Sequence, residues 1–197
     1  MKENLQNNLL KKYPEFFSYL NEGRKIYTGN NGIKELLNQK AIVLPIQFGF
    51  ECGDGWYLLL NELMSNIQEH MKWKNEYADR KLKWEIAEKI VFWIRNKISN
   101  KFGRYLEKIL PKGRPHIILQ IDQIKEKFGG LRFYYSGGDD EISGMVRLAE
   151  SLSYHICEFC GTTHNVGMTK GWFSTICKSC LELNPRLNNL KWELNIN

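Results

Sequence analysis

Apolar side chains recur at helical spacing through much of the first half of the chain. In the segment from about Gly55 to Tyr77 they fall at four-residue steps, at Leu59, Leu63, Ile67 and Met71. Steps of this length place side chains on one face of a helix, so the segment is expected to be a long helix. The same reasoning predicts further helices over residues 2–12, 15–21, 33–38, 78–99 and 102–110.

After His116 the repeat shortens to two residues. Apolar and polar residues alternate over 117–122 and again over 131–135, which is the pattern of strands with one buried face. Gly129 and Gly130 lie between these segments and predict the turn of a hairpin. The short apolar run at 41–46 is expected to be a buried extended segment that Pro45 either ends or places at a sheet edge.

A last helix is expected after the Ser-Gly-Gly-Asp-Asp loop at 136–140, which supplies its cap. This helix leads directly into Cys157, and its apolar stripe consists of Ile142, Met145, Val146, Ala149, Leu152 and Ile156. The fold class that follows is α+β, with several helices packed on a small antiparallel sheet and a zinc ribbon-like module near the C-terminus. The expected divisions are an N-terminal helical segment (1–40), a main domain (41–156), a zinc-binding module (157–183) and a tail (184–197).

The strongest chemical signal is a pair of Cys-x-x-Cys motifs. Cys157 and Cys160 form the first, Cys177 and Cys180 form the second, and 16 residues separate the two. This spacing is typical of a four-thiolate zinc site, in which each motif supplies two ligands. Such a site leaves no coordination position open, so the zinc ion is expected to be structural.

Two disulfides are the alternative arrangement of these cysteines. Disulfide frameworks belong to secreted chains, and the polar segment after Met1 has no apolar signal core, so zinc is favoured. His155 and His164 lie close enough to replace one thiolate, but four cysteines make a histidine ligand unnecessary. No apolar run reaches the roughly 18 residues of a membrane span. We therefore expect a cytoplasmic protein, located in the host cytoplasm if a phage encodes it.

Basic residues are concentrated in one part of the chain. The whole chain carries a formal charge of +6, but residues 72–114 hold thirteen Lys or Arg against five Asp or Glu, a local excess of +8. This is the electrostatic footprint of an anionic partner such as a nucleic acid or a nucleotide.

Four cations in this region recur at steps of four, three and four residues, and so share a face if the helix is continuous: Lys97, Lys101, Arg104 and Lys108. With Trp84 and Trp93 nearby, that face is a candidate phosphate-binding surface. The alternative is a solvated helix face with the tryptophans in the core.

The stretch from Phe48 to Trp56 interleaves three glycines with aromatic and acidic residues. In one interpretation the glycines make a turn and Asp54 caps the helix that follows. In the other, Glu51 and Asp54 are metal ligands or acid–base groups at a cleft. Cys52 would lie near a positive helix terminus, but no local pattern pairs it with a histidine base.

The turn end of the predicted hairpin is crowded with charge. Lys125, Glu126 and Lys127 precede the turn, and Arg132 follows it. If Asp122, Glu126 and Arg132 share a sheet face that looks towards the glycine-rich stretch, they complete a polar pocket of mixed charge. The alternative is an ordinary solvated hairpin.

Three stretches stand out together: Phe48 to Tyr57, Lys125 to Tyr135, and the cysteine segment with Gly161, Gly171 and Trp172 between its motifs. In this order they resemble a set in uncharacterised small proteins of bacteriophages and prophage-bearing bacteria, over about residues 46–180. The resemblance implies a phage or mobile-element setting and a zinc module, with no reaction attached. It also implies these candidate ligand-binding residues: Glu51, Asp54, Trp56, Lys125, Glu126, Lys127 and Arg132.

Three functions fit these features. The favoured one is a zinc-stabilised accessory protein that binds a nucleic acid or a nucleotide. The second is a metal-dependent hydrolase or nuclease that holds Mg²⁺ with Glu51 and Asp54, joined by Glu126. The third is an inhibitor that binds a host protein. The sequence contains no glycine-rich phosphate loop, nucleophile elbow or histidine-rich metal motif, so a binding protein is expected before an enzyme.

Overall fold

The computed structural model describes residues 1–17, 49–97 and 116–195. The chain divides into two compact units, one formed by residues 1–67 with 119–197 and the other by residues 68–118. Three predicted segments, 33–38, 41–46 and 102–110, lie outside the described residues, as does most of 15–21. Within the described residues, no helix is both long enough and apolar enough to cross a membrane.

The helical first half is built from α1 (Glu3–Lys12), a 3-10 turn at residues 14–17, the 3-10 helix η3 (Asp54–Trp56) and α3 (Tyr57–Lys97). The expectation of two helices meeting near Ala78 is wrong, because α3 is a single helix of 41 residues. Its sequence contains neither Gly nor Pro, so nothing in it interrupts the backbone hydrogen bonds. The part of α3 in the first unit buries Leu60, Leu63, Met64 and Ile67.

The predicted hairpin is present as β1 (Leu119–Lys127) and β2 (Gly130–Gly137). Its two-residue turn is Phe128–Gly129, and both residues have positive φ, 56° and 78°. Two positive φ values define a type I′ turn, whose twist matches that of the strands. Gly130 belongs to β2 rather than to the turn, and a Cβ there would lie 2.4 Å from the Tyr154 ring.

The register of the hairpin overturns its predicted polar face, and a bulge in β1 takes Asp122 out of the pairing. Ile121 pairs with Tyr135 and Gln123 with Tyr134, so the residue between them is unpaired. Beyond the bulge Glu126 lies opposite Leu131, whereas Arg132 lies opposite Lys125. Directly opposed residues share a face, so Glu126 and Arg132 point to opposite sides of the sheet.

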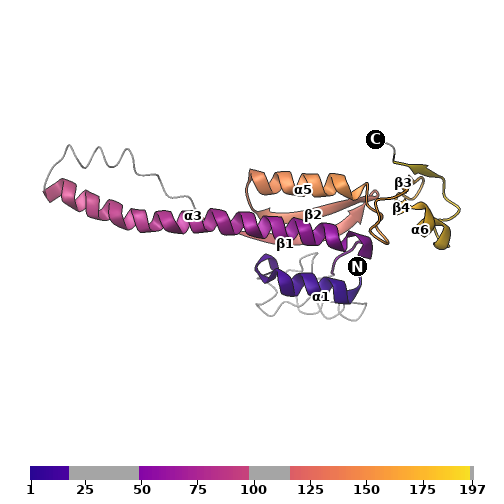
Figure 1. Cartoon of the computed structure of the whole chain (residues 1–197), viewed down its shortest axis with the longest axis horizontal. Helices are drawn as coiled ribbons and strands as arrows, with labels where there is room; N and C mark the ends of the chain where they lie inside the picture. Colours follow the sequence, from indigo (N-terminus) through magenta and orange to yellow (C-terminus); the bar gives the residue numbers. More distant parts are fainter. Residues whose placement is uncertain (18–48, 98–115, 196–197) are drawn as a thin grey trace, which may run out of the picture. The chain divides into compact units, whose positions relative to one another are not determined.

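Helix α5 (Asp140–Ser153) packs against the hairpin, chiefly on β2 (Figure 1). Asp139 caps it, because its Oδ1 accepts the Ile142 N–H at 3.0 Å, as the loop sequence predicts. The buried positions Ile142, Val146, Ala149 and Ser153 follow helical spacing, whereas Leu152, placed in the predicted stripe, is 43% exposed. The Ser153 hydroxyl accepts the Leu131 N–H at 2.9 Å and ties α5 to β2.

Residues 157–195 form what we call the four-cysteine module. It contains β3 (Val166–Thr169), β4 (Thr175–Cys177), α6 (Lys178–Leu183) and β5 (Trp192–Leu194). The three strands form an antiparallel sheet of order β4-β3-β5. Trp192 docks the tail, since its Nε1 donates to Ile176 O at 3.0 Å and its ring packs on the module's core. That core consists of Cys157, Val166, Ile176, Cys177, Leu181 and Leu187. The α+β fold class with a C-terminal cysteine module is thus confirmed.

Candidate metal centre

Four of the five cysteines converge on one point. Their sulfur atoms lie within 4.8 Å of one another: Cys157, Cys160, Cys177 and Cys180. The Sγ atoms of Cys160 and Cys177 are 3.7 Å apart. A tetrahedron with Zn–S bonds of about 2.3 Å has S–S edges of about 3.8 Å, whereas a disulfide requires about 2.05 Å. The cysteines are free, and their spacing fits a metal ion rather than disulfides.

Backbone hydrogen bonds shape both Cys-x-x-Cys turns. In the first, the Gly161 N–H donates to Cys157 O at 2.9 Å and the Cys157 N–H donates to Thr162 O at 2.8 Å. In the second, Cys177 ends β4 and caps α6, and its Sγ accepts the Cys180 N–H at 3.4 Å. Each turn therefore brings two sulfurs to the same side of its backbone.

The thiols differ in how readily they ionise. Burial raises the pKa of Cys157. At Cys160 burial acts in the same direction, but hydrogen bonds from the Thr162 backbone and the other cysteines lower the pKa overall. A bound cation is the group that allows all four to be thiolates together, since its charge offsets theirs.

The glycine-rich stretch packs directly on the first Cys-x-x-Cys turn. The Gly55 N–H donates to Glu158 O at 2.8 Å, and the Gly53 N–H donates to Glu158 Oε1 at 2.9 Å. A Cβ on Gly55 would lie 2.2 Å from Cys157 O, and one on Gly161 would lie 2.8 Å from Gly55 O. These glycines permit two backbones to touch beside the converging cysteines, a role that the sequence did not reveal.

The same stretch extends the hairpin on the β1 edge. Glu51 forms an isolated parallel bridge with Lys125, through Glu51 N to Ile124 O at 2.9 Å and Glu126 N to Glu51 O at 2.8 Å. The hairpin turn in turn meets the four-cysteine module, because the Thr175 hydroxyl donates to Gly129 O. All three sequence motifs thus meet at the first Cys-x-x-Cys turn and its neighbours. Their occurrence together in one chain was the signal for this contact.

The acidic residues of the stretch have protein partners. Glu51 Oε2 accepts a hydrogen bond from Gln123 at 2.8 Å. Asp54 accepts the Lys2 N–H at 2.6 Å and pairs with Lys2 Nζ at 3.0 Å. Although desolvation acts to raise it, these contacts lower the pKa of Asp54. Asp54 is the first residue of η3 and its carboxylate bonds Lys2 rather than helix N–H groups, so the predicted cap is wrong.

Two other residues of this stretch are buried. Trp56 is fully buried, and its Nε1 donates to Ile156 O at 3.0 Å, next to Cys157. Cys52 is 6% exposed, and burial raises the pKa of its thiol to about 12. Cys52 is therefore a neutral thiol at physiological pH. Burial also raises the pKa of Glu158, to about 7.

The charged residues of the hairpin are spread around it. Arg132 donates to the Tyr154 hydroxyl at 3.0 Å and to Leu131 O at 2.7 Å, and Glu126 accepts the Gly129 N–H. Lys125 Nζ lies 5.2 Å from the Tyr134 ring centre and Lys127 Nζ lies 5.3 Å from that of Phe128. In the described part of the chain, the carboxylates of Glu51, Asp54 and Glu126 do not gather within 4.8 Å as a group.

The predicted basic face lies largely beyond the described residues. Lys97 is the last residue of α3, whereas Lys101, Arg104 and Lys108 fall in 98–115. Trp93 is 61% exposed, which contradicts the alternative that it belongs to the core.

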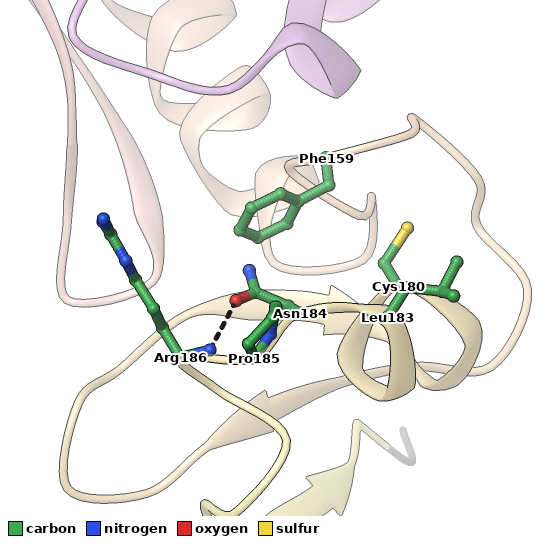
Figure 2. Close-up of a pocket in the computed structure, with 6 residues that line it drawn as sticks. All are labelled: Phe159, Cys180, Leu183, Asn184, Pro185 and Arg186. Atoms are coloured by element: carbon green, nitrogen blue, oxygen red, sulfur yellow. Dashed lines mark hydrogen bonds between the residues drawn. The ribbon is translucent and has the colours of Figure 1, made fainter.

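An open hollow of about 530 Å³ adjoins the candidate metal centre (Figure 2). Residues from both sides of the centre line it: Phe159, Cys180, Leu183, Asn184, Pro185 and Arg186. The Arg186 N–H donates to Asn184 Oδ1 at 3.0 Å and fixes the turn after α6. Cys180 lines this hollow and Cys160 is exposed, so these two of the four cysteines lie at the surface.

No protein-family model, curated protein or solved structure matches the chain. Within the described residues, the features that mark the site are the convergence of four thiols and the contacts that hold the three motifs against them.

Proposed function

We propose that the four cysteines hold a structural Zn²⁺ and that the protein binds an anionic ligand, a nucleic acid before a free nucleotide. Thiolates in a tetrahedral set favour zinc among common divalent ions, and four protein ligands leave no position for a substrate. The zinc ion would stabilise the four-cysteine module and the motifs packed on it. The anionic ligand would then bind to other surfaces of the protein.

The binding proposal is supported chiefly by exposed aromatic side chains in the unit of residues 68–118, which contains the basic region. Trp73 and Tyr77 are 58% and 48% exposed, and their rings stack at 6.3 Å between centres with 21° between planes. Lys74 Nζ lies 5.5 Å from the Trp73 ring centre, and Trp93 is also exposed. All belong to the unit of residues 68–118, where the excess of +8 lies. Aromatic faces stack on bases, and the cations around them attract phosphates.

The predicted basic face supplies phosphate contacts in this proposal. Lys97, Lys101, Arg104 and Lys108 would each neutralise one phosphate and release its counterion. In the phage or mobile-element setting that the motifs imply, the ligand is nucleic acid in the host cytoplasm. The partners found for Glu51 and Asp54 favour this binding role over a hydrolytic one.

The test is fluorescence anisotropy of a labelled oligonucleotide across a salt series. For a single strand, the slope of log affinity against log salt is about −0.7 per phosphate contact. Replacing the four cations by alanine should therefore flatten the slope by about 3. An affinity independent of salt would contradict phosphate binding, and displacement of the oligonucleotide by micromolar nucleotide would reassign the ligand class.

A further inference from the structure

A bulky aromatic residue occupies the hairpin turn where asparagine or glycine is usual. Phe128 has φ of 56°, in the left-handed region that side chains with a Cβ rarely adopt. That conformation costs roughly 1 kcal/mol. Burial does not offset the cost, since Phe128 is 63% exposed. A strained, exposed aromatic residue in a turn is a reason to look for a function there.

The turn that carries Phe128 is held firmly in place. Glu126 Oε1 accepts the Gly129 N–H, and the Thr175 hydroxyl donates to Gly129 O. A Cβ on Gly129 would lie 3.0 Å from the Met168 methyl group, so the turn presses on β3. The hairpin tip therefore belongs to the same rigid surface as β3 and β4.

A second exposed aromatic segment adjoins the turn. The loop between β3 and β4 carries Trp172, 71% exposed, and Phe173, 45% exposed. The Phe173 and Phe128 ring centres are 6.5 Å apart and the rings are nearly perpendicular, at 85°. The Thr169 hydroxyl donates to Trp172 O at 2.6 Å and fixes the loop. We call Phe128, Trp172 and Phe173 the aromatic tip.

Positive charge lies beside Phe128 in the aromatic tip. Residues 125–132 contain three Lys or Arg and one acidic residue, Glu126, whose carboxylate accepts the Gly129 N–H. On the four-cysteine module, Lys170 and Lys178 pair with Glu193 at 2.6 Å and Glu182 at 4.0 Å. Lys127 Nζ lies 5.3 Å from the Phe128 ring centre.

We infer that the aromatic tip is a stacking platform for unpaired bases of a single-stranded nucleic acid, whose phosphates contact Lys127 and its neighbours. This inference rests on the proposed function and assigns it a second contact surface, separate in sequence from the basic region. Every base has a π-face, and stacking on an aromatic side chain is worth about 1–3 kcal/mol per base. A protein interface would also use exposed aromatics, but lysines are depleted there, whereas phosphates require them.

The test measures the affinity of a labelled oligo-dT of about 15 nucleotides for two tip variants, with the full-length zinc-loaded protein. Phe128→Asn removes the ring but keeps a residue that accepts positive φ, and Trp172→Ala removes the most exposed ring. Leu148→Ala is the control, because Leu148 is 60% exposed on α5. Each tip variant should bind at least about five-fold more weakly, the control should bind as wild type, and a duplex of equal length should bind less tightly.

The outcomes separate this inference from the proposed function. If wild type binds the oligonucleotide and both tip variants bind equally well, the stacking platform is refuted while nucleic-acid binding stands. If wild type binds neither single strand nor duplex, both proposals fall. If the tip variants lose a host protein partner but keep their oligonucleotide affinity, the tip is a protein interface and the inference is overturned.

Discussion

A methyl group added at Gly55 should disturb the contact between the glycine-rich stretch and the first Cys-x-x-Cys turn. The new Cβ would lie 2.2 Å from Cys157 O, 2.5 Å from Gly161 N and 2.8 Å from the Glu158 carbonyl carbon. All three are backbone atoms, so no side-chain rotation relieves the overlap. Restoring an ordinary contact distance requires the backbones to separate by about 1 Å.

That separation would break the hydrogen bond from Gly55 N to Glu158 O, which is 2.8 Å long. The lost hydrogen bond costs about 1 kcal/mol and the residual strain about 1–3 kcal/mol, so Gly55→Ala should destabilise by about 3 kcal/mol. For a chain of this length the melting temperature should fall by about 6–12 °C. Because the strain falls on Cys157 and Gly161, zinc affinity should fall as well.

The assay is thermal unfolding followed by circular dichroism, together with competition for zinc by a coloured chelator. Gly144→Ala is the matched control: Gly144 lies in α5, and apart from its chain neighbours and the nearby backbone of its own helix no described atom lies within 4 Å of the added methyl group. There the substitution should raise stability by up to about 1 kcal/mol through helix propensity. A Gly55→Ala protein that melts with wild type and holds zinc equally well would refute the proposed backbone contact.

Four further predictions concern the cysteines and the hairpin. Cys160→Ser should lose most of its zinc, whereas Cys52→Ser should retain it, as measured by metal analysis after gel filtration. Gly130→Ala should destabilise by about 1–3 kcal/mol because its Cβ would lie 2.4 Å from Tyr154; in the Tyr154→Leu background the penalty should shrink, and an unchanged penalty would exclude that clash. Cys52 should resist Ellman's reagent from pH 7 to 9 in the folded protein, because burial raises its pKa to about 12. The neutral thiol's stabilising contribution is present below pH 9 and lost between about pH 9 and 12, so Cys52→Ala should weaken the fall in stability over that range.

Local patterns predicted the elements whose cause is local. The period-two alternation predicted the hairpin, the loop at 136–140 predicted the capped start of α5, and the cysteine spacing predicted which four thiols converge. Each depends on residues that lie near one another in sequence or on ligands of a known spacing.

The remaining features depend on contacts between distant segments. Asp54 has the sequence of a helix cap, but Lys2 takes its carboxylate. The bulge in β1 leaves Asp122 unpaired, and no residue type near Asp122 predicts it. Gly53 and Gly55 resembled turn residues in the sequence. They are needed because Glu158, more than 100 positions away, approaches their backbone, and local patterns do not reveal such a contact.

Native mass spectrometry of the purified protein with a single-stranded oligonucleotide tests whether a zinc-stabilised scaffold binds nucleic acid. We expect a complex of one chain, one zinc ion and one oligonucleotide at low salt, with the oligonucleotide lost as salt is raised and the zinc retained. A chain without zinc that remains folded would contradict the metal centre. A zinc-loaded chain that binds no oligonucleotide at low salt would contradict the binding function.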